Sequence, residues 1–202
     1  MFSKIESVIK ELENIPISEE RKIILRPLID FIIGKKEVGT EIYLNFICTH
    51  NSRRSHLAQI WAQTMASYFT IKNVNCFSGG TEVTALFTSV KDTLEEIGFV
   101  FETTSGGENP IYKITFSETE KPVIGFSKIY DDTFNPTNNF VAIMTCSQAD
   151  ENCPFIMGAE KRISITYEDP KEFDNTPIQK EKYKERSMQI AAEMYYVFSR
   201  IN

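Results

Sequence analysis

The feature that most constrains this chain is an apolar run that leads through a short polar segment directly into an amphipathic helix. Residues 42–47 are mostly apolar and predict a strand. Residues 55–69 predict a helix, because apolar residues recur there at helical spacing: Leu57, Ile60, Trp61, Met65 and Tyr68. Strand, loop and helix in this order are typical of a parallel sheet covered by helices, so we expect an α/β fold.

Strand and helix patterns alternate along the rest of the chain, which supports this expectation. The ranges that predict further strands are 74–78, 99–103, 140–145 and 164–167. Residues 111–115 and 123–126 predict a β-hairpin within an insertion of about 106–126. The last helix is expected to have Thr176 as its N-cap, with Gln179 completing a capping box.

The N-terminal residues 1–40 predict two helices and form an attachment to the α/β unit. The second helix is expected to follow Ser18 as N-cap, to be kinked or split by Pro27 and to stop at Gly34. At roughly 150 residues per domain, 202 residues correspond to one domain with an extension. We therefore divide the chain into a helical extension, 1–40, and an α/β domain, 41–202, that is expected to carry the function.

Charge and hydropathy exclude several classes of function. The 22 basic and 28 acidic residues give a net charge of -6, which argues against a general nucleic-acid-binding protein. No apolar run approaches the ~18 residues needed to cross a bilayer, and the N-terminus lacks the features of a signal peptide. We expect a cytoplasmic protein that binds neither nucleic acid nor membrane.

Four cysteines stand at positions 48, 76, 146 and 153. In a reducing compartment, cysteines are catalytic, metal-binding or buried rather than joined in structural disulfides. The chain has no Cys-x-x-Cys pair and only two histidines, so we predict no metal site and no cofactor. Cys76 lies inside a predicted strand and is expected to be a small buried hydrophobe.

The segment between the first predicted strand and its helix has the composition of an anion-binding loop. Its residues are Cys48, Thr49, His50, Asn51, Ser52, Arg53, Arg54 and Ser55. Backbone N–H groups at a helix N-terminus converge on an anion and favour the thiolate form of a cysteine. The planar guanidinium of Arg54 suits two oxygens of a tetrahedral oxyanion. Ser55 is placed to donate to the thiolate, and Asn51 tolerates a left-handed backbone.

This loop resembles that of the low-molecular-weight protein tyrosine phosphatases, and within that superfamily it reads very similarly to the thioredoxin-coupled arsenate reductases. The resemblance spans about residues 42–201, without the hairpin, and implies a four-stranded parallel sheet flanked by helices. It implies Cys48 as nucleophile, residues 49–54 as the oxyanion-binding loop and Arg54 as the clamp. It also implies Asp169, in an Asp-Pro step before the last helix, as general acid. Glu168 and Asp174 are competitors for that last role.

Residues 146–154, Cys-Ser-Gln-Ala-Asp-Glu-Asn-Cys-Pro, resemble the redox segment of the arsenate reductases, which carry a cysteine pair at the same spacing. The resemblance implies that Cys146 attacks the Cys48 sulfur and releases arsenite. Cys153 would then move the disulfide to a place where thioredoxin reduces it.

Three positions depart from the family pattern. His50 replaces the usual glycine of the loop, and Arg53 stands where relatives often have another cysteine. Gln59 occupies a position where some reductases have a glutamate that helps to hold a potassium ion, so we predict no such ion.

Three functions remain open. The first is a thioredoxin-coupled arsenate reductase, and the three-cysteine set favours it. The second is a low-molecular-weight protein tyrosine phosphatase, in which Cys48 forms a phosphocysteine that water hydrolyses and Cys146 is dispensable. The third is a non-catalytic anion-binding or interaction module, in which His50 has damaged the loop and the N-terminal helices recruit a partner.

Overall fold

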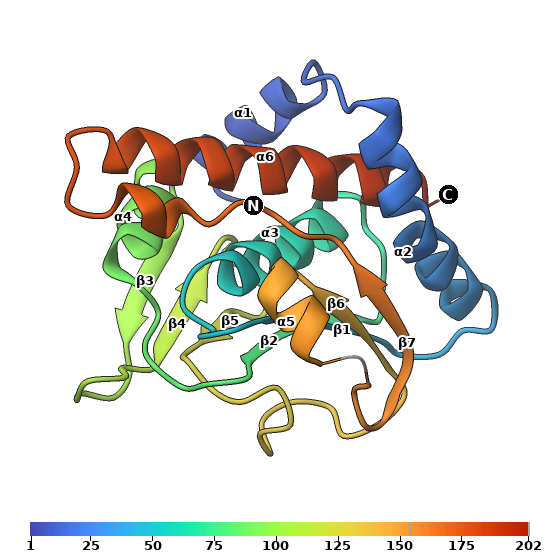
Figure 1. The fold of residues 1–202 in the computed structure, drawn as a ribbon. Helices are drawn as coiled ribbons and strands as arrows, with labels where there is room; N and C mark the ends of the chain where they lie inside the picture. Colours follow the sequence, from blue (N-terminus) through green and yellow to red (C-terminus); the bar gives the residue numbers. More distant parts are fainter. Residues whose placement is uncertain (154, 202) are drawn as a thin grey trace.

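The computed structural model describes residues 1–153 and 155–201, and a parallel sheet lies at its centre (Figure 1). The four strands follow the order β2-β1-β6-β7 and all neighbours pair in parallel. Their bounds are Ile42–Cys48 for β1, Val74–Gly80 for β2, Phe140–Met144 for β6 and Ala159–Ser164 for β7. The predicted α/β fold with a four-stranded parallel sheet is confirmed.

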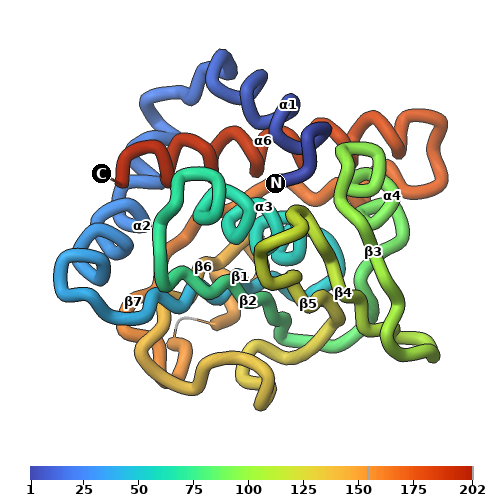
Figure 2. Tube along the Cα trace, turned by 180° about the vertical axis from the view of Figure 1, so that it is seen from behind, coloured from blue at the N-terminus to red at the C-terminus, as the bar shows by residue number. Residues whose placement is uncertain are grey.

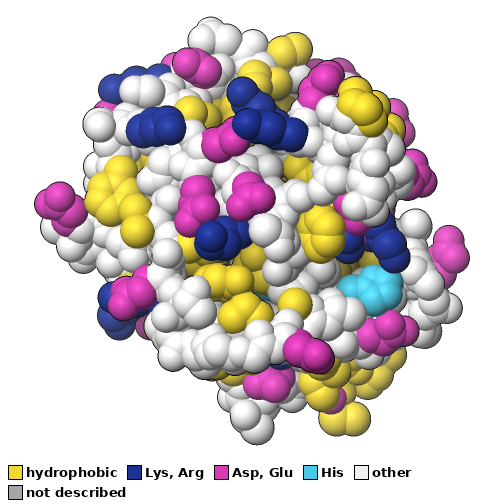
Figure 3. Space-filling view, turned by 90° about the vertical axis from the view of Figure 1, so that its left-hand side faces the viewer, with side chains coloured by type: hydrophobic (Ala, Val, Ile, Leu, Met, Phe, Trp, Pro, Cys, Tyr) yellow, Lys and Arg dark blue, Asp and Glu magenta, His cyan; other side chains and the backbone are white. Residues whose placement is uncertain are grey.

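Helices cover this sheet. The bounds are Ser3–Leu12 for α1, Glu19–Glu37 for α2, Arg54–Tyr68 for α3, Thr88–Ile97 for α4, Ser147–Asn152 for α5 and Gln179–Ser199 for α6, with a short 3-10 helix, η1, over Pro170–Phe173. Over the described residues, none of these helices combines the length and apolar character that a membrane crossing requires. The face shown in Figure 3 carries basic and acidic side chains in alternation, without a large patch of one sign.

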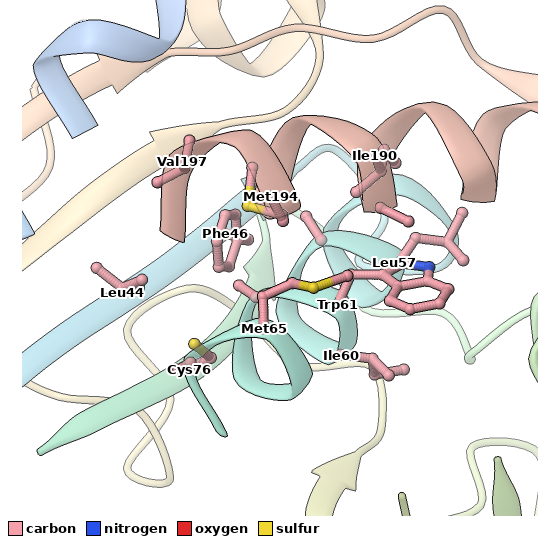
Figure 4. Packing of buried hydrophobic residues seen from close by; sticks show 14 of the residues in the cluster. Leu44, Phe46, Leu57, Ile60, Trp61, Met65, Cys76, Ile190, Met194 and Val197 are labelled. Atoms are coloured by element: carbon pink, nitrogen blue, oxygen red, sulfur yellow. The ribbon is translucent and has the colours of Figure 1, made fainter. Parts of the chain in front are cut away.

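The core lies where α3 packs between the sheet and α6 (Figure 4). Trp61 of α3 is completely buried, and its indole N–H donates to Ser187 Oγ of α6 at 3.0 Å. Phe46 of β1 and Met194 of α6 are buried in the same cluster. Because both faces of β1 are covered, its sequence is apolar at nearly every position rather than alternating.

The N-terminal helices extend this core rather than standing apart from it. Both Figure 1 and Figure 2 show α1 against α6 and α2 beside β7, and Ile5, Ile9 and Leu28 are buried in the same cluster as α3. The prediction that Gly34 ends the second helix is wrong, and Pro27 does not split it: α2 continues to Glu37. Val38 is the C-cap of the helix, and Gly39 after it adopts the left-handed backbone of a helix terminus, φ +70°.

The predicted hairpin belongs to a second, antiparallel sheet. Strands β3 (Val100–Thr103), β4 (Tyr112–Thr115) and β5 (Val123–Gly125) pair in the order β3-β4-β5. The β4–β5 pair is the predicted hairpin, which is thereby confirmed. The predicted strand 99–103 joins it as β3 instead of entering the parallel sheet. Most of β3 is exposed, whereas a parallel strand needs both faces covered.

Two boundaries differ from the prediction. The strand expected at 164–167 is β7, Ala159–Ser164; the apolar residues Ile165 and Tyr167 that suggested it are buried just beyond the strand. Thr176 does not cap the last helix, because its hydroxyl donates to Phe173 O at 2.7 Å and α6 begins only at Gln179. The first error arises because Ile165 and Tyr167 are buried although they lie in a loop. The second arises because Thr176 belongs to a turn that follows Phe173 and precedes the helix.

Arg21 and Glu193 tie the N-terminal helices to α6, and their removal tests how far the extension stabilises the fold. The Arg21 guanidinium donates to both carboxylate oxygens of Glu193, at 2.9 and 2.6 Å, and the Glu193 residue is 2% exposed. Arg21→Ala leaves that carboxylate buried and unpaired, so we expect the free energy of unfolding to fall by about 3 kcal/mol in urea denaturation. Lys10→Ala, which breaks an exposed pair with Glu6, is the control and should change nothing. Equal stability of the two variants would contradict this role of Arg21.

Candidate functional site

The segment 48–55 forms a loop between the carboxyl end of β1 and the start of α3. Asn51 adopts a left-handed backbone, φ +44°, and its side-chain N–H donates to Ser55 Oγ at 2.9 Å. Ser55 Oγ lies 3.1 Å from Cys48 Sγ, within the distance of a hydrogen bond. The loop thus brings the candidate nucleophile, Ser55 and Asn51 into one buried group.

The end of β2 holds the backbone of this loop in place. The carbonyl oxygen of Thr49 accepts from the N–H groups of Thr81 and Glu82, at 2.8 and 2.9 Å. The carbonyl oxygen of His50 accepts from Ser127 Oγ at 2.9 Å. With the carbonyl groups bonded to neighbouring segments, the loop is arranged to present N–H groups to an anion.

Arg54 lies across the loop and contacts the candidate acid. Its guanidinium donates to Asp169 Oδ2 at 2.5 Å and to the carbonyl oxygen of Tyr167 at 2.8 Å. Its Nε is buried and finds no hydrogen-bond partner among the described residues. A buried donor without an acceptor is costly, so this atom fits an oxyanion bound in the loop. The structure therefore brings Arg54 and Asp169 together at the loop.

The Arg53 side chain belongs to a separate hydrogen-bond network. It donates to Tyr183 OH at 2.6 Å and to Asp174 Oδ2 at 2.7 Å, and its guanidinium carbon lies 4.0 Å from the Phe87 ring centroid. Burial and the bond to Asp174 raise the pKa of Tyr183. Of the predicted oxyanion-binding groups of Arg53, only the backbone N–H is therefore left. Asp174, a competitor of Asp169 for the role of general acid, accepts hydrogen bonds from both Arg53 and Tyr183. Glu168, the other competitor of Asp169, is exposed.

His50 stands at the rim of the loop. Its Nε2 lies 3.4 Å from Glu82 Oε2, and its side chain is 36% exposed. Next to it, a cavity of about 430 Å³ is lined by loop residues and by apolar and basic side chains, among them Leu86, Phe87 and Lys171. The loop residues His50, Ser52 and Arg53 therefore border a cavity much larger than a free oxyanion.

Three of the four cysteines gather at the carboxyl ends of β1 and β6. Cys48 and Cys146 are buried in one small cluster, against which Cys153 packs half-buried. Thr49 Oγ1 lies 3.5 Å from Cys146 Sγ and so stands between the loop and this thiol. Cys146 precedes α5 and its sulfur accepts from Ala149 N at 3.3 Å, while Cys153 follows the same helix.

Cys76 lies apart from the other three cysteines. Across the described residues all four cysteines are free thiols, and burial raises the pKa of Cys76, which lies in β2 within the other core cluster. Pro154, the last residue of the predicted redox segment, lies outside the described residues. Within those residues, no three His, Cys, Asp or Glu side chains come together in a way that would hold a metal ion.

Two buried basic residues behind the loop were not predicted from the sequence. Lys128 is 1% exposed; its backbone N–H donates to Asn51 Oδ1 at 2.9 Å, and burial lowers the pKa of its ammonium to about 8. His56 Nδ1 lies 3.3 Å from Ser78 Oγ. Burial, together with the charge of Lys128, lowers the pKa of His56 to about 3, so this imidazole is neutral at pH 7.

No family model matches this chain, and no curated protein sequence matches it. Its fold is similar to solved structures. A low-molecular-weight phosphotyrosine phosphatase from Vibrio cholerae O395 superposes with a TM-score of 0.53 at 12% identity, covering 78% of this chain and 94% of that one. An arsenate reductase from Archaeoglobus fulgidus DSM 4304 gives 0.51 at 18% identity, covering 77% and 98%. An arsenate reductase in the phosphate-binding state gives 0.50 at 17% identity, covering 80% and 99%. These likenesses show that the fold is of the low-molecular-weight phosphatase type.

Gly80 provides a test of the loop geometry. A Cβ at this position would lie 2.6 Å from Thr49 O and 2.8 Å from Asn51 N, so Gly80→Ala must displace the loop backbone. We expect the variant to bind inorganic phosphate at least about tenfold more weakly than the wild type in calorimetric titration, a loss of about 1.4 kcal/mol. Gly106→Ala is the matched control, because a Cβ there meets nothing within 4 Å among the described residues. Unchanged affinity in Gly80→Ala would show that the loop does not form the anion site.

His56 gives a pH dependence of known sign. The unfolded chain binds a proton on this residue below about pH 6.5, whereas the folded chain does so only near pH 3. Stability is therefore lost as the pH falls through this window, with a slope of up to about 1.4 kcal/mol per pH unit from this residue alone. His56→Gln should remove that part of the slope when urea denaturation is compared between about pH 7 and about pH 5. Parallel pH profiles of the two proteins would contradict the burial of a neutral imidazole.

Proposed function

We propose that this protein is an arsenate reductase that is regenerated by thioredoxin or a similar dithiol protein. The observation that carries the proposal is the common location of Cys48, Cys146 and Cys153 in one cluster beside the candidate anion-binding loop. An oxyanion-binding loop with a single nucleophilic thiol would suffice for hydrolysis. Two further thiols in the same cluster supply what reduction also requires. Such thiol chemistry belongs in a reducing compartment, and we place the enzyme in the cytoplasm.

In the first step, the loop N–H groups and Arg54 hold arsenate while the Cys48 thiolate attacks the arsenic atom. A sulfur–arsenic bond forms and an arsenic–oxygen bond breaks. Asp169, which forms an ion pair with Arg54 at 2.5 Å, takes up a proton from solvent before the reaction and then gives it to the departing oxygen, so that water leaves. Ser55, at 3.1 Å from the sulfur, stabilises the thiolate before the attack.

In the second step, the Cys146 thiolate attacks the sulfur of Cys48. A disulfide forms, and the electron pair of the sulfur–arsenic bond passes to arsenic, which leaves as arsenite after reduction from As(V) to As(III). Cys153 then attacks the Cys146 sulfur, and Cys48 departs as a thiolate. The resulting Cys146–Cys153 disulfide is reduced by the external dithiol, whose own two thiols become oxidised.

Formation of the Cys146–Cys153 disulfide requires α5 to unwind. Cys146 and Cys153 stand at opposite ends of this six-residue helix. At about 1.5 Å rise per residue, their Cα atoms are separated by roughly 10 Å. A disulfide needs a Cα separation of about 4.4–6.8 Å, so the helix must give up its hydrogen bonds in this step.

A second candidate function is supported by the cavity beside the loop. A volume of about 430 Å³ next to His50 and Phe87 is large enough for an aryl group, and it borders the loop. In a phosphatase of this kind, Cys48 would form a phosphocysteine and Asp169 would protonate the leaving alkoxide or phenoxide. Water would then complete hydrolysis of a phosphotyrosine-like ester, with no need for Cys146.

The variant Cys146→Ser separates the two functions. We expect it to lose arsenate-dependent NADPH consumption with thioredoxin and thioredoxin reductase by at least about 10³-fold, because its hydroxyl cannot complete the transfer of electrons to arsenic. Cys48→Ser should be equally inactive, and Cys76→Ser, a buried cysteine outside the site, should keep wild-type turnover.

Hydrolysis of an aryl phosphate is measured on the same proteins. If neither the wild type nor Cys146→Ser reduces arsenate while both hydrolyse the ester equally well, the reductase proposal is wrong and the phosphatase function replaces it.

A further inference from the structure

Arg162 contacts the segment between the two relay cysteines. Arg162 stands on β7 opposite Ala142 of β6, with Ser164 two positions further along. Because side chains alternate along a strand, Arg162 and Ser164 lie on the same face of β7. Both bond to Asp150, so this is the face toward α5. The edge strand of the parallel sheet thus meets the helix between the two relay cysteines (Figure 1).

The guanidinium of Arg162 joins two turns of that segment. Its Nη2 donates to both the carbonyl oxygen and the Oδ1 of Asp150, each at 2.5 Å, and its Nε donates to the carbonyl oxygen of Cys153 at 3.0 Å. Ser164 Oγ donates to the other Asp150 oxygen at 2.7 Å. Carbonyl groups at the C-terminal end of a helix lack helical partners, and a cation there stabilises the helix. Arg162 therefore stabilises α5 at the end occupied by Cys153.

We infer that Arg162 is a positioning residue that keeps the Cys146–Cys153 segment helical in its dithiol form and thereby sets how readily the pair becomes a disulfide. The inference rests on the proposed relay, in which α5 must unwind. Unwinding moves Asp150 relative to Cys153, so the bonds that Arg162 makes to both residues do not survive the step. Loss of Arg162 favours the disulfide because it destabilises only the form in which these bonds exist.

The test uses a chain with Cys48→Ser and Cys76→Ser, in which Cys146 and Cys153 are the remaining thiols. Oxidised glutathione is the oxidant: one thiolate forms a mixed disulfide, the second displaces glutathione, and two electrons pass from the pair to one glutathione disulfide. We expect Arg162→Ala in this background to form the disulfide about tenfold faster than the parent, since bonds to a charged group are lost. We also expect the equilibrium constant for disulfide formation, measured in dithiothreitol buffers, to be about tenfold larger in Arg162→Ala than in the parent. This corresponds to a reduction potential about 30 mV lower.

Two further variants keep the test decisive if Arg162→Ala does not fold. Arg162→Lys keeps the charge but cannot bridge both residues, and Asp150→Asn keeps the shape but loses the ion pair; each should fall between the parent and Arg162→Ala. Arg26→Ala is the control, because Arg26 pairs with Asp30 on the exposed face of α2 and should not affect the rate.

Equal or slower disulfide formation in the Arg162 variants overturns the inference, and so does a complete failure of every variant to form the Cys146–Cys153 disulfide. No arsenate enters these measurements. A chain that fails to reduce arsenate but still forms the disulfide faster without Arg162 would therefore reject the proposed function and leave the role of Arg162 standing.

Discussion

The parallel pairing of β1 with β2 on one side and β6 on the other is the constraint on which the site depends. In a parallel sheet the carboxyl ends of the strands meet at one edge, where ligands bind. The register places Cys48 beside Gly80 and Ile47 beside Met144. The loop, the glycine that gives it room and the chain leading to Cys146 therefore become neighbours. A slip of one residue would turn the buried side chains of β1 to the opposite face and separate all three.

Within this apolar frame, Asn51 links the loop to the rest of the molecule. Its Oδ1 accepts from Lys128 N at 2.9 Å, while its Nδ2 donates to Ser55 Oγ at 2.9 Å, which in turn lies 3.1 Å from Cys48 Sγ. An aspartate could accept the first bond but could not donate the second. Asn is also among the few residues that tolerate the left-handed backbone found here. Hydrogen bonding and backbone conformation therefore select the same residue type.

The sequence predicts most of what local patterns determine. The apolar strand, the polar segment and the helix over residues 42–69 were predicted from hydrophobic spacing and from a loop composition that suits anion binding. The errors arise where residues distant in the sequence determine the partner of a side chain or of a strand. Nothing near Arg53 indicates that Asp174 and Tyr183 take its side chain. The exposed strand β3 reads like any short strand, and its partner β4 becomes evident only in the fold. Arg162 and Lys128 are ordinary basic residues until their neighbours are known.

The position of Cys146 bears on how one site would treat two similar oxyanions. In the proposed mechanism, attack by Cys48 on arsenate or on a phosphoester would use the same loop, the same Arg54 and the same acid, so the first half of both reactions would be shared. The second half differs in the atom that is attacked: water must reach phosphorus from the open side, whereas a thiol must reach the Cys48 sulfur from within the protein. Cys146 is 1% exposed and stands on that inner side, beyond Thr49. Displacement at sulfur expels arsenite readily, because As(V) is reducible by thiols, but it does not expel phosphorus in a lower oxidation state. A phosphocysteine would therefore wait for water even with Cys146 in place, and the central atom of the substrate, rather than the shape of the loop, would decide between reduction and hydrolysis.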